Sequence, residues 1–202
     1  MKYLLGTVLI ISILAASAAA NTCSLIPTAD TWVWSGHGPW GYSPTLRTNF
    51  TPSTDQEIVI RFDLSSIPSG STINSAYLFV YRYDGASQTD SLVCEIYRVT
   101  EEWEETTLVD SIAHDSGFLY DQITITGNGW YSMNVIALVQ EWIDGTYSNY
   151  GAVFYGTAGM GSYQYFRSKE NPTDKPHLDI DYTPPNLFEQ TTFGSIKASF
   201  GM

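Results

Sequence analysis

The sequence is poor in the residues that build metal centres, disulfide networks and nucleic-acid surfaces. Its 202 residues include two cysteines, three histidines and nine lysines or arginines, against 21 aspartates and glutamates. The histidines show no His-x-x-x-His or Cys-His spacing, so no metal site is predicted. The formal net charge of −12 argues against nucleic acid as a partner, because phosphate binding needs a basic surface.

Catalytic signatures are also missing. No Gly-x-Ser-x-Gly nucleophile elbow occurs, and acidic pairs such as Glu101 and Glu104 cannot be placed across a cleft from their spacing. We therefore predict no catalytic residues and no enzymatic activity. The alternative is a polysaccharide lyase, which would use Tyr, His and Arg side chains around a groove on a β-sandwich.

Long hydrophobic runs are absent beyond the N-terminus. Lys2 precedes an apolar run that ends at Ala16, and small residues follow up to Ala20, which is the layout of a secretory signal peptide. The run is too short for a good membrane span. We expect residues 1–20 to be a signal peptide and the mature protein to be secreted, extracellular or at the cell surface, with no membrane span.

The two cysteines allow one crosslink. Export to an oxidising compartment makes a disulfide between Cys23 and Cys94 the expected state. It would tie the mature N-terminus to a central strand. The alternative is a pair of free thiols, with Cys94 buried in a strand.

Short strand-like runs separated by Gly, Pro, Asn and Asp clusters dominate the rest of the chain. This spacing predicts an all-β fold, a jelly-roll-like antiparallel β-sandwich. The expected strands are residues 29–34, 56–64, 73–82, 91–100, 122–126, 151–155, 163–168 and 178–182.

One segment has helical periodicity. Val135, Leu138, Val139 and Trp142 follow i, i+3, i+4, i+7 spacing, and Gly145 stands where a helix would end. The sequence therefore predicts one short helix lying over a sheet edge, with Asn134 as a possible cap.

A single domain accounts for the mature chain. We expect it to cover residues 21–184, because the Pro184-Pro185 pair cannot continue a central strand. Residues 185–202 form a C-terminal tail with Phe193, Ile196 and Phe200 at helical spacing. The tail could dock, act as a sorting tag or stay flexible.

Aromatic residues make the expected sheet surface unusual. If the aliphatic residues between 76 and 80 face the core, then Tyr77, Phe79 and Tyr81 form an outward stripe. Such a stripe must be covered by the protein itself, by a partner or by a sugar ring. Trp32 and Trp34 share one strand face and more commonly line a core, whereas Trp40, in a Gly/Pro-rich loop, is the better candidate for an exposed platform.

The charged residues offer two interpretations. Arg47, Arg61, Arg167 and Lys169 could meet the carboxylate of an acidic sugar, or pair internally, Arg61 with Asp63 and Lys169 with Glu170. The glutamates that surround Trp103 suggest calcium, but they lack the ligand spacing of a calcium loop. A solvated acidic turn is the simpler interpretation, Asp30 is a second weak calcium candidate, and no cofactor is predicted.

Ordered motifs carry a resemblance to a known family. They are Ala29-Asp30-Thr31, Ile60 to Pro68, Ile73 to Leu78, Tyr97 to Thr100 with Trp103 and Glu104, Leu138 to Trp142 through Gly151, and Phe166 to Glu170 with Pro176 to Leu178. Together they resemble the DNRLRE (disaggregatase-related) repeat family over residues 29–182. Lys169 departs from the arginine usual before Glu170, which weakens bidentate recognition of a carboxylate at that position.

The resemblance implies a non-catalytic carbohydrate-binding module, with acidic polysaccharides such as alginate as one ligand class. The alternative is a structural subunit of a surface layer, matrix or filament, which would associate with itself or with other surface proteins. The candidate ligand-binding residues are Trp40, Tyr42, Arg47, Tyr77, Tyr81, Arg167 and Lys169.

Overall fold

The computed structural model describes residues 19–51, 54–85, 91–159 and 163–186. One compact unit, Ala20–Pro185, holds every described strand and the helix. The other unit, residues 1–19 and 186–202, lies almost wholly outside the described residues. The predicted signal peptide and the tail from residue 187 onward therefore fall outside the described part of the chain.

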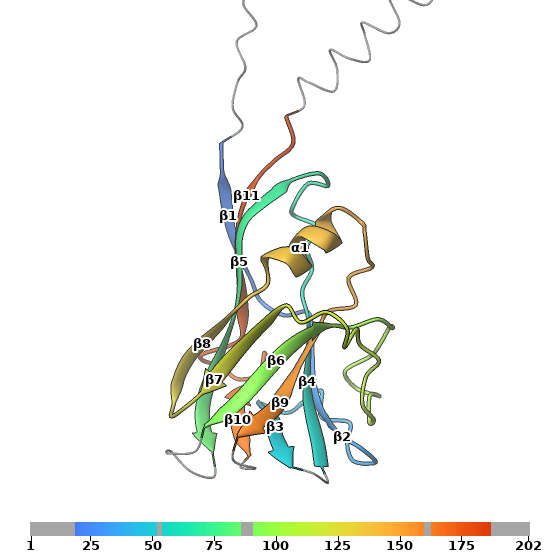
Figure 1. Cartoon of the computed structure of the whole chain (residues 1–202), viewed down its shortest axis with the longest axis vertical. Coiled ribbons are helices and arrows are strands. Elements are labelled where there is room, and N and C mark those ends of the chain that lie inside the picture. Colours follow the sequence, from blue (N-terminus) through green and yellow to red (C-terminus); the bar gives the residue numbers. More distant parts are fainter. Residues whose placement is uncertain (1–18, 52–53, 86–90, 160–162, 187–202) are drawn as a thin grey trace, which may run out of the picture. The chain divides into compact units, whose positions relative to one another are not determined.

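The described unit is built from antiparallel strands with one short helix, which confirms the predicted all-β fold (Figure 1). The elements are β1 (Asn21–Leu25), β2 (Ala29–Trp34), β3 (Thr45–Thr51), β4 (Thr54–Arg61), β5 (Thr72–Gly85), β6 (Leu92–Arg98), β7 (Asp121–Ile125), β8 (Gly129–Asn134), α1 (Ile136–Ile143), β9 (Ala152–Gly159), β10 (Gln164–Arg167) and β11 (His177–Thr183).

The strands form two layers that one strand joins. In the first, here the β5 layer, β5 pairs with β11 and β10 along one edge and with β8 along the other, and β1 extends β11. In the second, the β4 layer, β4 lies between β2 and β9, and β6 and β7 follow. β3 pairs with β10 through residues 45–48 and with β4 through residues 49–51, so the sheet is continuous.

The core lies between the layers and follows the period of two residues along each strand. Ile58 and Ile60 of β4 face Leu78 and Val80 of β5, and all four are at most 1% exposed. A second, smaller cluster covers the other face of β4, where Val59 packs with Trp103 under the segment between β6 and β7. Both faces of the β4 layer are therefore largely closed to solvent.

The predicted helix is confirmed, although its start differs. α1 buries Leu138, Val139 and Ile143 against the core. The helix begins after Val135 and has no side-chain cap there, but the Asn134 Oδ1 atom still accepts the Ile136 N–H at 3.1 Å. Gly145, with φ of 70°, follows its end as expected.

The sequence prediction missed three strands, β1, β3 and β8. β1 and β3 carry mostly polar residues, and β8 is short and begins at Gly129, so none shows a clear apolar alternation.

The predicted disulfide is wrong, because Cys23 and Cys94 are both free thiols. Cys23 lies on the edge strand β1, whereas Cys94 is fully buried in β6 of the other layer.

The register of β5 can be tested with two adjacent substitutions. Leu78→Ala should lower the free energy of unfolding by about 2–5 kcal/mol, because Leu78 is 1% exposed at the centre of the core. Tyr77→Ala should change it by only about 0.5 kcal/mol, since Tyr77 points outward and is 39% exposed. Urea unfolding of both variants measures the difference, and equal losses would contradict this register.

Candidate functional site

Aromatic rings cover the outer face of the β5 layer. Along β5 the outward residues are Tyr77, Phe79, Tyr81 and Tyr83, because the residues between them point into the core. β11 and β8 place further rings beside these four, since paired residues of neighbouring strands share a face. We call this surface the outer aromatic face.

The rings at one end of this face form a contact series. Phe79 stacks on His177 of β11 with ring centroids 4.8 Å apart, and His177 meets Trp130 of β8 at 5.0 Å. Trp130 packs edge-on against Tyr81 at 5.2 Å, and Phe79 contacts Tyr77 at 6.5 Å. Trp130 is 44% exposed and Tyr77 is 39% exposed, so solvent reaches the series at two points.

The other end of the face combines rings with guanidinium groups. Tyr83, Tyr165 and Tyr163 follow one another with centroids about 6.5 Å apart. The Arg167 guanidinium carbon lies 4.0 Å above the Tyr83 ring. The Arg47 guanidinium carbon lies 4.4 Å from the Tyr163 centroid and 4.5 Å from that of Trp32.

Ring contacts hold these two arginines in place, and no described carboxylate pairs with them. The Arg47 Nε–H donates to the Gln56 side-chain oxygen at 2.7 Å, which fixes the guanidinium against its rings. Within the described part of the chain, neither Arg47 nor Arg167 has a carboxylate within ion-pairing distance. Both cations therefore remain available to an acidic ligand.

The tryptophans near Arg47 differ from the expected exposed platform. Trp40 stacks on Trp32 at 4.7 Å and is half-buried, so one of its ring faces is covered. Trp32 is 6% exposed and belongs to the core, as predicted, with Trp34 packed against that core. Tyr42, two residues beyond Trp40, is the open ring of this loop at 80% exposure.

A groove continues the outer aromatic face toward β1. It encloses about 510 Å³. Tyr77 and Phe79 form its aromatic side, while Asp179 and Asp181 with hydroxyl groups of β1 and β5 form its polar side. Hydroxyl and carboxylate oxygens beside an aromatic ring can bind the hydroxyl groups of a sugar.

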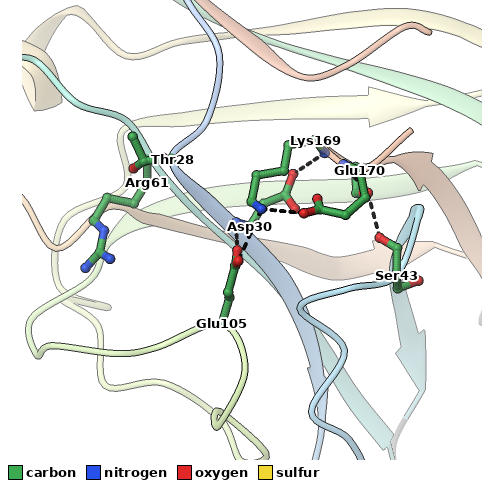
Figure 2. Close-up of polar contacts among 8 residues, drawn as sticks. Thr28, Asp30, Ser43, Arg61, Glu105, Lys169 and Glu170 are labelled. Atoms are coloured by element: carbon green, nitrogen blue, oxygen red, sulfur yellow. Dashed lines mark hydrogen bonds and ion pairs between the residues drawn. The ribbon is translucent and has the colours of Figure 1, made fainter. Parts of the chain in front are cut away.

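Lys169 lies in a different, internal polar cluster (Figure 2). Its ammonium group contacts Glu170 at 2.5 Å and Glu105 at 3.1 Å. Burial lowers the pKa of Lys169, but the hydrogen bonds to these carboxylates outweigh it and raise the pKa overall. The predicted Lys169–Glu170 pair is thus present, and both partners serve the fold. The predicted Arg61–Asp63 pair is not: Arg61 lies over Trp103 at 5.2 Å.

Asp30 is the buried centre of this cluster. Its Oδ2 atom accepts the Lys169 backbone N–H at 2.7 Å, and its own N–H donates to Glu105 Oε2 at 3.1 Å (Figure 2). Asp30 is 1% exposed, and burial raises its pKa to about 7 despite the hydrogen bond from Lys169. Glu105 is therefore part of a structural anchor and not of a solvated acidic turn.

The cluster also supports the loop that carries Trp40 and Tyr42. Gly41 packs directly on Glu105, since a Cβ atom there would lie 2.3 Å from the Glu105 carbonyl oxygen. Ser168, next to Lys169, donates its hydroxyl to the Ser43 carbonyl at 2.6 Å. The Asp30 cluster thus holds this loop from two sides.

The sequence identified part of the outer aromatic face. Tyr77, Tyr81, Arg47 and Arg167 lie on it, and Tyr42 lies on the supported loop. The residues that were missed are Tyr83 of β5, Trp130 of β8, Tyr165 of β10, His177 of β11, and Tyr163, which lies just before β10. The alternation of Tyr163, Tyr165 and Arg167 along one face was the signal that could have found the two tyrosines.

Two further properties concern the described residues as a whole. They contain no group of three or more His, Cys, Asp or Glu side chains placed to hold a metal ion. None of their helices is long and apolar enough to cross a membrane.

The raised pKa of Asp30 predicts a pH-dependent stability. Between about pH 4 and pH 7 the folded protein keeps a proton that the unfolded chain has lost, so stability should fall as pH rises through this window. The slope should reach at most about 1.4 kcal/mol per pH unit. Asp30→Asn, which keeps an acceptor for Lys169 N–H, should remove this component.

Urea unfolding at a series of pH values measures the effect. The exposed Glu102→Gln variant serves as the control and should keep the wild-type profile. Coincident profiles for wild type and Asp30→Asn would show that Asp30 titrates normally.

Comparison with known proteins agrees with this geometry. The family model of carbohydrate-binding module family 96 matches residues 21–182, which is most of the chain and all of its described strands but the last residue of β11. No curated protein matches the chain. The expected carbohydrate-binding module is confirmed, and the DNRLRE resemblance is compatible with it. The chain belongs to carbohydrate-binding module family 96.

Proposed function

We propose that this chain is a secreted, non-catalytic module that binds an acidic polysaccharide along its outer aromatic face. The observation that carries the proposal is the placement, on one face, of aromatic rings and two arginines that have no carboxylate partner among the described residues. The family membership supports carbohydrate as the ligand.

The rings supply stacking planes for sugars. A pyranose ring presents an apolar C–H face, which packs on an aromatic plane much as two rings pack on each other. Tyr77 and Tyr83 are six residues apart on β5, which corresponds to about 20 Å along an extended strand. The outer aromatic face is thus long enough to contact several consecutive sugar units, as polymer recognition requires.

The arginines favour an acidic sugar. A guanidinium offers a planar pair of donors that matches a carboxylate, and stacking on a ring fixes its orientation before the ligand arrives. Arg167 on Tyr83 and Arg47 between Trp32 and Tyr163 both meet this description. Lys169 does not, because its charge is already shared by Glu105 and Glu170.

Ligand binding without catalysis accounts for the stacked arginines and the aromatic rings beside them. The stacked arginines are oriented by rings and by Gln56, and their role needs no proton transfer. The alternative, a structural subunit, requires the outer aromatic face to be covered by a neighbouring copy. Tyr77 and Trp130 are open in the described unit, which favours a ligand surface.

Alginate is a direct probe of this proposal. Arg167→Ala should weaken retardation in an alginate gel by at least tenfold in apparent affinity, because a charge-assisted pair is worth about 1.5–3 kcal/mol. Arg167→Lys should recover only part of the loss, since lysine lacks the planar fork. Rising salt should weaken wild-type binding.

Arg61→Ala is the matched control, because Arg61 also stacks on a ring but lies on Trp103, away from the outer aromatic face. It should bind alginate like wild type. If both arginine variants lose affinity equally, net charge and not this site explains binding. Absence of wild-type binding together with self-association on size-exclusion chromatography would favour the structural subunit.

Export is tested separately. When the full chain is produced in a bacterial host with a secretory pathway, the extracytoplasmic protein should begin at Asn21, because Ala18-Ala19-Ala20 forms the expected cleavage site. N-terminal sequencing measures this. An unprocessed chain retained in the cytoplasm would contradict secretion.

A further inference from the structure

Two further exposed rings lie outside the outer aromatic face. Tyr147 is 41% exposed and Phe118 is 50% exposed. Both belong to connecting segments, Phe118 to the one before β7 and Tyr147 to the one after α1. Exposed aromatic side chains indicate a binding site more often when further contacts tie them into one cluster, as they do here, than when they are scattered.

Arg98 contacts both segments that carry these rings. It follows Cys94 and Ile96 on the core-facing side of β6 and is 8% exposed. Its guanidinium carbon lies 3.6 Å from the Tyr147 ring centroid, so one face of that ring is fixed and the other can meet solvent. Its Nη2 atom pairs with Asp115 at 2.8 Å. Arg98 thereby connects Tyr147 to the segment that carries Phe118.

Tyr120 and Glu141 complete the frame. Phe118 packs edge-on against Tyr120 with centroids 4.8 Å apart. The Tyr120 hydroxyl donates to the Glu141 carboxylate, and burial together with this bond raises the pKa of Tyr120. The Glu141 carbonyl accepts the Thr146 N–H at 2.9 Å, next to Tyr147. Both exposed rings are thus positioned before any ligand binds, which lowers the entropic cost of binding.

The charges around these rings differ from those on the outer aromatic face. The Arg98 guanidinium is neutralised by Asp115, whose side chain is 37% exposed, and Glu141 adds a second carboxylate. Such a rim repels a polyuronate but accepts hydrogen bonds from sugar hydroxyl groups. The rings offer stacking planes, and the one guanidinium that contacts them among the described residues, that of Arg98, is paired with Asp115.

We infer that Tyr147 and Phe118, framed by Arg98, Asp115, Tyr120 and Glu141, form a second sugar-binding site that takes neutral hexose chains. The inference deepens the proposed function, because it gives the module two sites of different charge preference. A protein with both sites links a neutral polysaccharide to an acidic one. Linked sites raise the avidity for a material that contains both polymers.

Isothermal titration with cellohexaose and mannohexaose tests this site. Wild type should bind at least one of these neutral hexaoses. Tyr147→Ala should weaken that binding about tenfold, because it removes a stacking plane. Tyr147→Phe should restore it, since the ring and its contact with Arg98 remain. Phe118→Ala is a second test that leaves the Arg98–Tyr147 stack intact, and it should also weaken binding.

Arg167→Ala is the matched control and should leave hexaose binding unchanged while it weakens alginate binding. Failure of wild type to bind either hexaose would overturn the second site, and so would unchanged affinity in both ring variants. If Tyr147→Ala alters only self-association in sedimentation, the rings form a protein interface and the inference is wrong. If wild type binds alginate but neither hexaose, the site at Tyr147 and Phe118 is refuted and the proposed acidic site stands. If wild type binds a hexaose but not alginate, only the acidic site is refuted.

Discussion

The alternation of side chains along β5 is the constraint on which the rest of the structure depends. Its fourteen residues pair with β8, β10 and β11, so one strand sets the register of most of its layer. Leu78 and Val80 point inward and fix the core, which obliges Tyr77 and Phe79 to point outward. The stability of the fold and the existence of the outer aromatic face are therefore two results of the same register.

The polar interior performs a different task from the apolar core. Asp30, Glu105 and Lys169 join β2, the segment before β7 and the connection after β10, and Gly41 packs on the same anchor. Buried charges of this kind are a poor source of net stability, and the raised pKa of Asp30 is the sign of that cost. Their value lies in placing the loops around them, including the one that carries Trp40 and Tyr42.

Sequence reasoning recovered what depends on local pattern. The alternation in β4 and β5 and the spacing from Val135 to Trp142 predicted the fold class, the helix and the stripe at Tyr77 and Tyr81. It missed Trp130 because β8 is short and starts at Gly129, and only its pairing with β5 places the ring beside Tyr81. Whether Arg167 or Lys169 is free to bind a ligand depends on contacts between segments far apart in the chain, which no local pattern shows.

The distribution of charge limits how an acidic polymer can bind. The chain has a formal net charge of −12, and Asp179 and Asp181 line the groove at the β1 end of the outer aromatic face. Arg47 and Arg167 lie toward its opposite end, where β3, β10 and the end of β5 meet. A uronate chain is therefore attracted at one end and repelled at the other, unless a cation screens the aspartates. This asymmetry favours one position of the acidic units along the face and leaves the aspartate end to hydroxyl-rich, uncharged parts of the ligand.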